Sequence, residues 1–214
     1  MTADRAPVIA VDGPAAAGKG TLARRLAGTF ALPYLETGLL YRAVGRRVLA
    51  AGADPADPAA AEAAARKLSP DDLARTDLRG PEADAASSAV AAIPGVRAAL
   101  LEFQRGFATG RGAVLDGRDI GTVIFPDAQA KLFLTASLAA RARRRWLELQ
   151  ARGLTAVLDE VERDLAVRDA QDRARTAAPL RPAPDAIVLD TTALDPDETY
   201  AHALEYVRTR LHLR

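Results

Sequence analysis

Short apolar runs alternate along this chain with longer stretches whose apolar residues recur every three or four positions. The runs are bounded by turn-forming residues and are too short for helices, which is typical of buried strands. Strands that alternate with helices in this way predict an α/β protein with a parallel sheet. The predicted strands are residues 7–12, 34–38, 113–116, 130–135 and 186–190.

The stretches between these runs predict helices. Residues 18–28 show the pattern most clearly, because Leu22, Ala23, Leu26 and Ala27 fall on one side of a helix. Turn-rich segments such as GADPADP at 52–58 separate the others. The remaining predicted helices end near residue 51, occupy pieces of 59–110, cover 137–177 with a break near Gly153, and cover 196–211.

Composition narrows the choice of partners. A chain of 214 residues with 49% hydrophobic and 27% charged residues suits one globular domain, which we expect to span 1–214. The net charge of +1 and the aromatic content of 5% argue against nucleic acid or a membrane as a partner. The sequence has no cysteine and no run of 18 apolar residues. We expect a cytoplasmic monomer that binds small molecules.

A phosphate-binding loop follows the first predicted strand and precedes the first predicted helix. Residues 13–21 read GPAAAGKGT and contain its G-x-x-x-x-G-K core. Small residues let backbone N–H groups turn toward a phosphate, and the helix dipole adds to the attraction. Lys19 then contacts the β- and γ-phosphates of ATP, and the Thr21 hydroxyl contacts Mg²⁺. The expected ATP-binding residues are Gly13, Pro14, Ala15, Ala16, Ala17, Gly18, Lys19, Gly20 and Thr21.

The lysine in this loop is unusual for the chain. Of its 29 basic residues only Lys19, Lys67 and Lys131 are lysine. A compact ammonium fits between phosphate oxygens where a planar guanidinium is too large. The loop has two departures from the usual pattern, since Gly20 separates Lys19 from Thr21 and Ala16 occupies a frequent glycine position. The alternative interpretation is an ordinary Gly/Ala turn before a helix.

Two further turns follow predicted strands, where ligands bind in parallel sheets. In ETGLLYR (36–42), Thr37 can cap a helix and leave its first amides for an anion close to Arg42. In DGRDIGT (116–122), Asp116 ends a strand, where a carboxylate for Mg²⁺ is expected, and Arg118 and Asp119 project from the loop. Taken alone, the first turn is better explained as a helix cap with a solvated arginine and the second as a turn with a local ion pair. Beside a phosphate loop, a site is favoured.

A third group of charges lies in RDAQDRART (168–176). Arg168, Asp172 and Arg175 are spaced i, i+4 and i+7 and therefore share a helical face. The alternative is a surface ladder of ion pairs, and for the arginines of 141–145 we expect a solvated face or contacts of a closing lid. Abundant arginine without a histidine near the motifs suits phosphoryl transfer to another phosphate, whose oxygen needs no general base.

Taken together, these motifs resemble those of the cytidylate kinases, a family of nucleoside monophosphate kinases. The resemblance implies a P-loop nucleoside monophosphate kinase fold with a five-stranded parallel sheet flanked by helices, a CMP-binding subregion at about 38–110 and a lid at about 141–177. It also implies transfer of the γ-phosphoryl group of ATP to CMP and dCMP with Mg²⁺. The segments that carry it are IAVDGPAAAGKGT (9–21), ETGLLYR, SAVAAIPGVRAALLEFQR (88–105), DGRDIGTVIFPDA (116–128) and RDAQDRARTAAPL (168–180).

The resemblance also implies roles for individual residues. Cytosine offers an amino donor and a ring acceptor, which suit a carboxylate and an arginine, whereas uracil reverses both. The implied roles are catalysis and phosphate clamping by Lys19, Arg42, Arg118 and Arg175, ribose binding by Arg168 and Asp172, cytosine reading by Ser88, Arg97 and Asp119, and further substrate contacts by Thr37 and Tyr41.

The chain departs from the family pattern in three places. Thr37 stands where a serine is usual and Glu36 where an aspartate is usual, and both changes keep the chemistry. Longer relatives carry an inserted small β-sheet where this chain has only residues 67–85, KLSPDDLARTDLRGPEADA. We expect this segment to form a helix and a loop.

Two other functions are compatible with the phosphate loop. One is a small kinase of the same fold that acts on AMP, UMP or a hydroxylated acid such as shikimate, which leaves the cytosine-reading residues unexplained. The other is a nucleotide-binding switch without transfer activity. Lys19, Asp116 and Arg118 together disfavour the switch.

Overall fold

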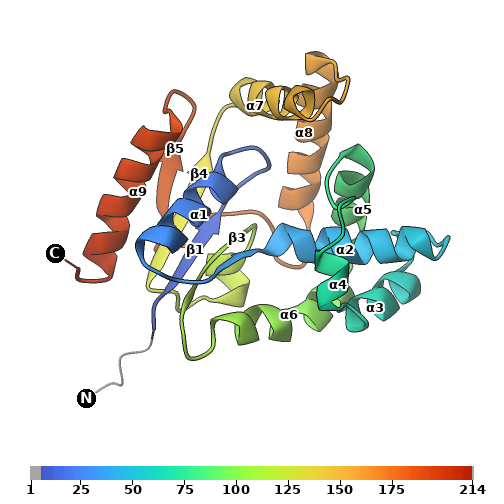
Figure 1. Cartoon of the computed structure of the whole chain (residues 1–214), viewed down its shortest axis with the longest axis horizontal. Helices are drawn as coiled ribbons and strands as arrows, with labels where there is room; N and C mark the ends of the chain where they lie inside the picture. The colour runs from blue at the N-terminus through green and yellow to red at the C-terminus, as the bar shows by residue number, and fades with distance from the viewer. Residues whose placement is uncertain (1–5, 214) are drawn as a thin grey trace. The chain divides into compact units, whose positions relative to one another are not determined.

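The computed structural model describes residues 6–213, and within them five strands form one sheet (Figure 1). The strand order is β2-β3-β1-β4-β5, and the pairs β1–β3, β1–β4 and β4–β5 are parallel. The predicted five-stranded parallel sheet is therefore confirmed. The strands are β1 (Val8–Asp12), β2 (Tyr34–Glu36), β3 (Ala113–Gly117), β4 (Ala130–Thr135) and β5 (Ile187–Asp190).

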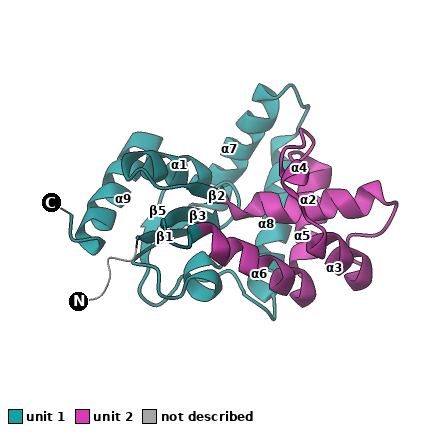
Figure 2. Ribbon diagram, turned by 60° about the horizontal axis from the view of Figure 1, so that its bottom comes forward, with its two compact units in different colours: residues 1–35, 108–214 teal, residues 36–107 magenta. Residues whose placement is uncertain are grey.

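The chain divides into two compact units, which are coloured separately in Figure 2. The sheet unit comprises residues up to Leu35 and from Ala108 onward, and the helical unit comprises Glu36–Phe107. Apart from the sheet, the sheet unit contains α1 (Lys19–Thr29), η1 (Ile120–Ile124), α7 (Leu138–Ala151), α8 (Leu158–Ala174) and α9 (Pro196–Arg210). The helical unit contains α2 (Thr37–Ala50), α3 (Pro58–Arg66), α4 (Pro70–Leu73), α5 (Pro81–Ala91) and most of α6 (Pro94–Ala108).

The core of the sheet unit explains why its strands are uninterrupted apolar runs. All five residues of β1 and all five of β3 are buried, as expected for strands with neighbours on both sides and helices over the sheet. The apolar stripe predicted for 18–28 packs against β1 and β4 together with α9. This core includes Ile9, Val11, Leu22, Ala23, Leu26, Ala27, Leu132, Leu134, Ala203 and Val207.

The register of the sheet places polar residues at one edge. Asp12, the last residue of β1, pairs with Gly117 of β3, and Val11 pairs with Asp116. Parallel strands end on the same side, so Asp12, Asp116 and the loop after β3 all lie at the carboxyl edge, where ligands bind in open α/β sheets.

Two helix boundaries differ from the predictions. Thr37 does not cap α2, because Glu36 is the N-cap residue, no side-chain cap bond forms, and Thr37 is the first helical residue. Helix α8 ends at Ala174 rather than near 177, because Arg175 is extended (φ −57°, ψ 132°). Arg175 therefore does not share a helical face with Arg168 and Asp172, as its spacing predicted.

A π-helix, η1, follows the loop after β3 and was not predicted from the apolar pattern. Its backbone bonds include Ile124 N–H to Asp119 O at 3.2 Å and Phe125 N–H to Ile120 O at 2.7 Å. Such single turns occur frequently at functional sites. The helix and loop predicted for residues 67–85 are confirmed. Helix α4 is a single turn capped by Ser69 and Asp72, and a loop leads from it to α5.

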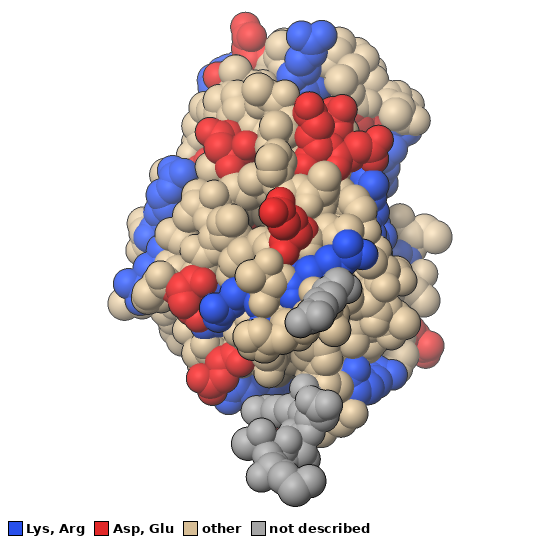
Figure 3. Space-filling view, turned by 90° about the vertical axis from the view of Figure 1, so that its left-hand side faces the viewer, with Lys and Arg blue, Asp and Glu red and all other residues tan. Residues whose placement is uncertain are grey.

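Among residues 6–213, no single helix is long and apolar enough to cross a membrane. The bent pair of α5 and α6, with 98° between the two helices, passes the same test of length and composition. Figure 3 shows acidic and basic side chains interspersed on one face of the molecule, which agrees with the near-neutral net charge of +1.

Candidate active site

The phosphate loop joins β1 to α1 and follows the backbone path that its glycines predict. Gly13 has φ +146°, and a Cβ there would lie 2.1 Å from the Leu134 carbonyl oxygen, so only glycine fits. Gly18 is left-handed at φ +91° and caps α1. Ala16, the residue at the frequent glycine position, is also left-handed at φ 60°, which accounts for the usual preference there.

The N-terminus of α1 has the features of an anion site. No side-chain cap bond forms at Gly18, and the first turn contains no acidic residue. The first amides of a helix lack partners within the helix and carry its positive dipole end. A phosphate at this position is stabilised by both effects.

Lys19 lies inside the loop. Its side chain is buried, and Nζ donates to the Pro14 carbonyl oxygen at 2.7 Å. Burial, followed by the positive charge of Arg118, lowers the pKa of Lys19 to about 7, although the Asp116 carboxylate acts in the opposite direction. A bound polyphosphate supplies the negative charge that keeps this ammonium protonated.

Asp12 belongs to this site, although it was predicted only as the last residue of a buried strand. Its two carboxylate oxygens accept the N–H groups of Ile120 and Gly121, both at 2.8 Å. Burial is the main reason that its pKa rises to about 7, with Asp119 adding to the effect. Asp12 thus ties the start of the phosphate loop to η1. One sequence signal could have indicated this role of Asp12: an aspartate at the end of an apolar run, directly before the glycine loop.

Asp172 joins two of the predicted clamp arginines. Its carboxylate accepts the Arg118 Nε hydrogen at 2.8 Å and lies 2.5 Å from Arg175 Nη2. Asp172 is 1% exposed. Burial by itself raises the pKa of Asp172, but Arg118 and Arg175 outweigh it and hold the pKa below its usual value. Arg168 also acts on this carboxylate and on Lys19, so the predicted residues of the sheet unit do come together.

Two arginines of α7 support the phosphate loop. Arg141 is 3% exposed, forms a two-bond pair with Asp169 of α8 (2.7 and 3.2 Å), and donates to the Ala15 carbonyl oxygen at 3.3 Å. Arg144 donates to Thr191, whose hydroxyl donates to the Ala17 carbonyl oxygen. The expected solvated face is therefore wrong for Arg141 and Arg144, which bond within the protein, and the expected lid contacts stay a prediction.

The acceptor residues predicted for the helical unit form two groups. Arg42 on α2 is bound by Glu36 and Asp84, with N–O distances of 2.8–3.2 Å. The Arg97 guanidinium lies 5.5 Å from the centre of the Tyr41 ring and donates to the Ala91 carbonyl oxygen. Thr37 is buried, and Ser88 lies on α5 with its side chain half-buried.

The predicted metal residues also belong to the sheet unit. Asp116 is 5% exposed, and its Oδ2 lies 3.4 Å from the place that a Cβ on Gly20 would occupy. Thr21 is exposed on the first turn of α1. Among residues 6–213 there is no group of three His, Cys, Asp or Glu side chains placed to hold a metal ion. A Cβ on Gly20 would also lie 3.5 Å from Arg24 Nη2 and from the Tyr34 hydroxyl, so Gly20 lies in ordinary contact distance of three polar side chains.

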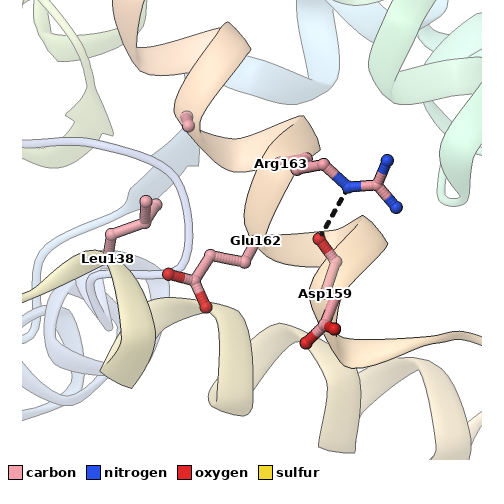
Figure 4. Close-up of a pocket in the computed structure, with 5 residues that line it drawn as sticks. Leu138, Asp159, Glu162 and Arg163 are labelled. Carbon is pink, nitrogen blue, oxygen red and sulfur yellow. Dashed lines mark hydrogen bonds between the residues drawn. The ribbon is translucent and has the colours of Figure 1, made fainter.

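A separate hollow of about 520 Å³ lies between α7 and α8 (Figure 4). Within it, Arg163 Nε donates to the Asp159 carbonyl oxygen at 3.2 Å. None of the predicted site residues lines it, and we assign it no role in the site. Its lining residues are Leu138, Asp159, Glu162, Arg163 and Ala166.

The sheet order, the phosphate loop between β1 and α1 and the arginines at the carboxyl edge define a P-loop kinase. A family model described as cytidylate kinase matches residues 9–209. The cytidylate kinase of Acidiphilium cryptum (strain JF-5) is 62% identical over 200 residues, with 94% of each chain covered. That of Paramagnetospirillum magneticum is 61% identical over 207 residues, covering 95% of this chain and 98% of the relative. The chain therefore belongs to the cytidylate kinase family, as the sequence motifs predicted.

A solved structure shares the fold. The crystal structure of an uncharacterized protein from Eubacterium ventriosum matches with a TM-score of 0.57 and 13% sequence identity. The match covers 95% of this chain and 99% of that chain. At this identity the likeness supports the fold alone.

Proposed function

We propose that this chain transfers the γ-phosphoryl group of ATP to CMP and dCMP, which gives ADP and CDP or dCDP. Its membership of the cytidylate kinase family supports this reaction. The strongest structural support for the proposal is an arrangement of positively charged side chains. Arg118 and Arg175 share the Asp172 carboxylate, and Arg118 is close enough to Lys19 to lower its pKa. Several cations are thus assembled beside a phosphate loop.

The donor half of the reaction rests on residues 13–21. The bare amides at the start of α1 and the Lys19 ammonium bind the ATP phosphates and stabilise charge on the transferred group. Mg²⁺, when bound near Thr21 and Asp116 through water, supplies further positive charge to these phosphates. Arg118 and Arg175 act on the transferred group from the loop after β3 and the end of α8.

The acceptor half of the reaction rests on arginines, on one ribose-binding carboxylate and on the base-reading residues. Arg42 binds the CMP phosphate with Arg118 and Arg175, and Arg168 and Asp172 contact the ribose. Because the acceptor oxygen is already anionic, alignment and charge neutralisation replace a general base. The cytosine-reading residues are Ser88, Arg97 and Asp119, with further substrate contacts from Thr37 and Tyr41.

Several finer expectations complete the proposal. The chain acts as one kinase domain with a CMP-binding subregion at about 38–110 and a lid at about 141–177. It functions as a cytoplasmic monomer with nucleotides as its partners, and without nucleic acid or membrane. The near-neutral net charge of +1 supports the last point.

The deciding experiment is ADP release from Mg²⁺-ATP in a coupled assay with CMP, dCMP, UMP, AMP, GMP and shikimate as acceptors. We expect turnover with CMP and dCMP well above the rest. Turnover with a different acceptor would keep the phosphate loop and overturn the cytosine assignment. ATP binding without turnover on any acceptor would favour the nucleotide switch instead.

A further inference from the structure

Helix α2 of the helical unit is joined by arginines to the short segment that replaces the inserted sheet. Three arginines on α2 pair with carboxylates that lie between residues 70 and 85. The pairs are Arg42–Asp84, Arg46–Glu82 and Arg47–Asp72. Only Arg42 among these three arginines has a role in the proposed site.

The guanidinium of Arg42 is held by two carboxylates. Its Nε and Nη2 both donate to Asp84 Oδ1, at 3.1 and 2.8 Å, and Nη1 donates to Glu36 Oε1 at 3.2 Å. A guanidinium has five N–H groups, and these three bonds leave one N–H on Nη1 and one on Nη2. Both remaining groups can donate to the oxygens of a phosphate.

The carboxylates that hold Arg42 are largely buried with it. The side chains of Arg42, Asp84 and Glu36 are 14%, 17% and 15% exposed. The second oxygen of Glu36 is bound by Arg79 Nη2 at 2.7 Å. Glu36 therefore links Arg42 to Arg79, and Asp84 is the second carboxylate that contacts Arg42.

We propose that Asp84 is a positioning residue for the acceptor nucleotide. By occupying the Nε side of the Arg42 guanidinium, it leaves one N–H of Nη1 and one of Nη2 for the acceptor phosphate. Holding the long arginine side chain in place before binding lowers the entropy lost when the phosphate arrives. This inference rests on the proposed function, because it takes the Arg42 ligand to be the phosphate of CMP.

The chain offers a matched control in Glu82. Glu82 and Asp84 both lie in the first turn of α5, and each pairs with an arginine of α2. Arg46, the partner of Glu82, is one helical turn beyond Arg42 and has no role in the proposed site. A loss that arises merely from loosening α5 against α2 will therefore appear in a Glu82→Gln variant as well.

The experiment measures KM for CMP, KM for ATP and kcat in the coupled assay. We expect Asp84→Ala to raise KM for CMP about tenfold and to leave KM for ATP unchanged. Asp84→Asn keeps an oxygen acceptor, so its increase should be less than about threefold. Glu82→Gln should match the unmodified chain. Unfolding transitions followed by circular dichroism check that each variant is folded.

A double-mutant cycle separates positioning from structure. In an Arg42→Ala background, Asp84→Ala should cause no further rise in KM for CMP, because Asp84 acts through Arg42. A lower KM for CMP in Asp84→Ala, or equal effects of Asp84→Ala and Glu82→Gln, would overturn the inference. If the unmodified chain does not phosphorylate CMP, the proposed function itself fails, and the inference fails with it.

Discussion

Arg118 donates its Nε hydrogen to Asp172 at 2.8 Å, although 54 residues separate them in the chain. Arg118 follows β3, and Asp172 lies near the end of α8. The same carboxylate is bound by Arg175. Two arginines that would repel one another are thereby held together at the carboxyl edge of the sheet, which is what stabilisation of a transferred phosphoryl group requires.

Replacement of Arg118 by alanine should therefore damage turnover and spare the fold. Asp172 keeps Arg175 as a partner, so no buried carboxylate is left alone. We expect kcat for CMP to fall by about three orders of magnitude, the low end for an arginine that stabilises transferred charge. Arg173→Ala on α8, whose side chain is 62% exposed, is the matched control. Near-normal turnover of Arg118→Ala would remove Arg118 from the mechanism.

The base preference should depend on Asp119. Its side chain is buried in the loop after β3, and a carboxylate accepts from the cytosine amino group but not from the uracil carbonyl. Asp119→Ala should reduce the preference for CMP over UMP, measured as the ratio of kcat/KM, by about 10- to 100-fold. Asp127→Ala, at an exposed aspartate further along the same segment, should leave the ratio unchanged. An unaltered ratio in Asp119→Ala would contradict the assignment.

The buried ion pair of Arg141 and Asp169 should contribute to the stability of the fold. Arg141 and Asp169 are 3% and 4% exposed, so Asp169→Asn leaves a buried guanidinium without its counter-charge. We expect a loss of about 3 kcal/mol in the free energy of unfolding, measured with urea. Asp164→Asn, at an exposed position on α8, should change it by less than about 0.5 kcal/mol. Equal stabilities of the two variants would show that the pair is not a net support of the loop.

The titration of the Asp12 carboxyl group should make the stability of the chain depend on pH. Burial raises the pKa of Asp12 from 3.8 to about 7, so between these values the folded chain keeps a proton that the unfolded chain has lost. The contribution of Asp12 to stability is therefore complete below about pH 4 and is lost as the pH rises through about 7.

The test compares Asp12→Asn with the unmodified chain by urea unfolding at pH 5, 6, 7 and 8. Loss of the carboxylate acceptor shifts the free energy of unfolding by the same amount at every pH. The titration of Asp12 instead makes the difference between the two proteins change with pH. The variant should gain stability relative to the unmodified chain by about 1 kcal/mol per pH unit between pH 5 and 7. A flat difference would mean that Asp12 is ionised throughout this range.

The Lys19 amine should take up a proton when ATP binds. Its pKa is lowered from 10.5 to about 7, and the ATP phosphates should raise it again. At pH 8 binding should therefore take up close to one proton, roughly the full charge of the ammonium. Calorimetric titrations in buffers with different ionisation enthalpies measure this number. Lys19→Met should remove the uptake, and equal uptake in both proteins would assign the proton to another group.

The strands, the main helices and the phosphate loop could all be predicted from the amino-acid pattern. These are local signals, since a short apolar run, the spacing of Leu22 and Leu26, and glycines at 13 and 18 each act within a few residues. The scarcity of lysine in the composition also drew attention to Lys19. The motifs from 9–21 to 168–180 were sufficient to indicate the family, which the comparisons confirmed.

The pairing of the charged residues, in contrast, became visible in the folded chain and could not be predicted. Asp12 reads as the end of an apolar strand and Arg141 as part of a charged helix, yet both are buried partners of distant backbone groups. Hydrogen bonds between residues far apart in the chain depend on strand order and helix packing, and periodicity along one helix says nothing about either. The same holds for Arg175, which leaves its helix and reaches Asp172 by an extended backbone.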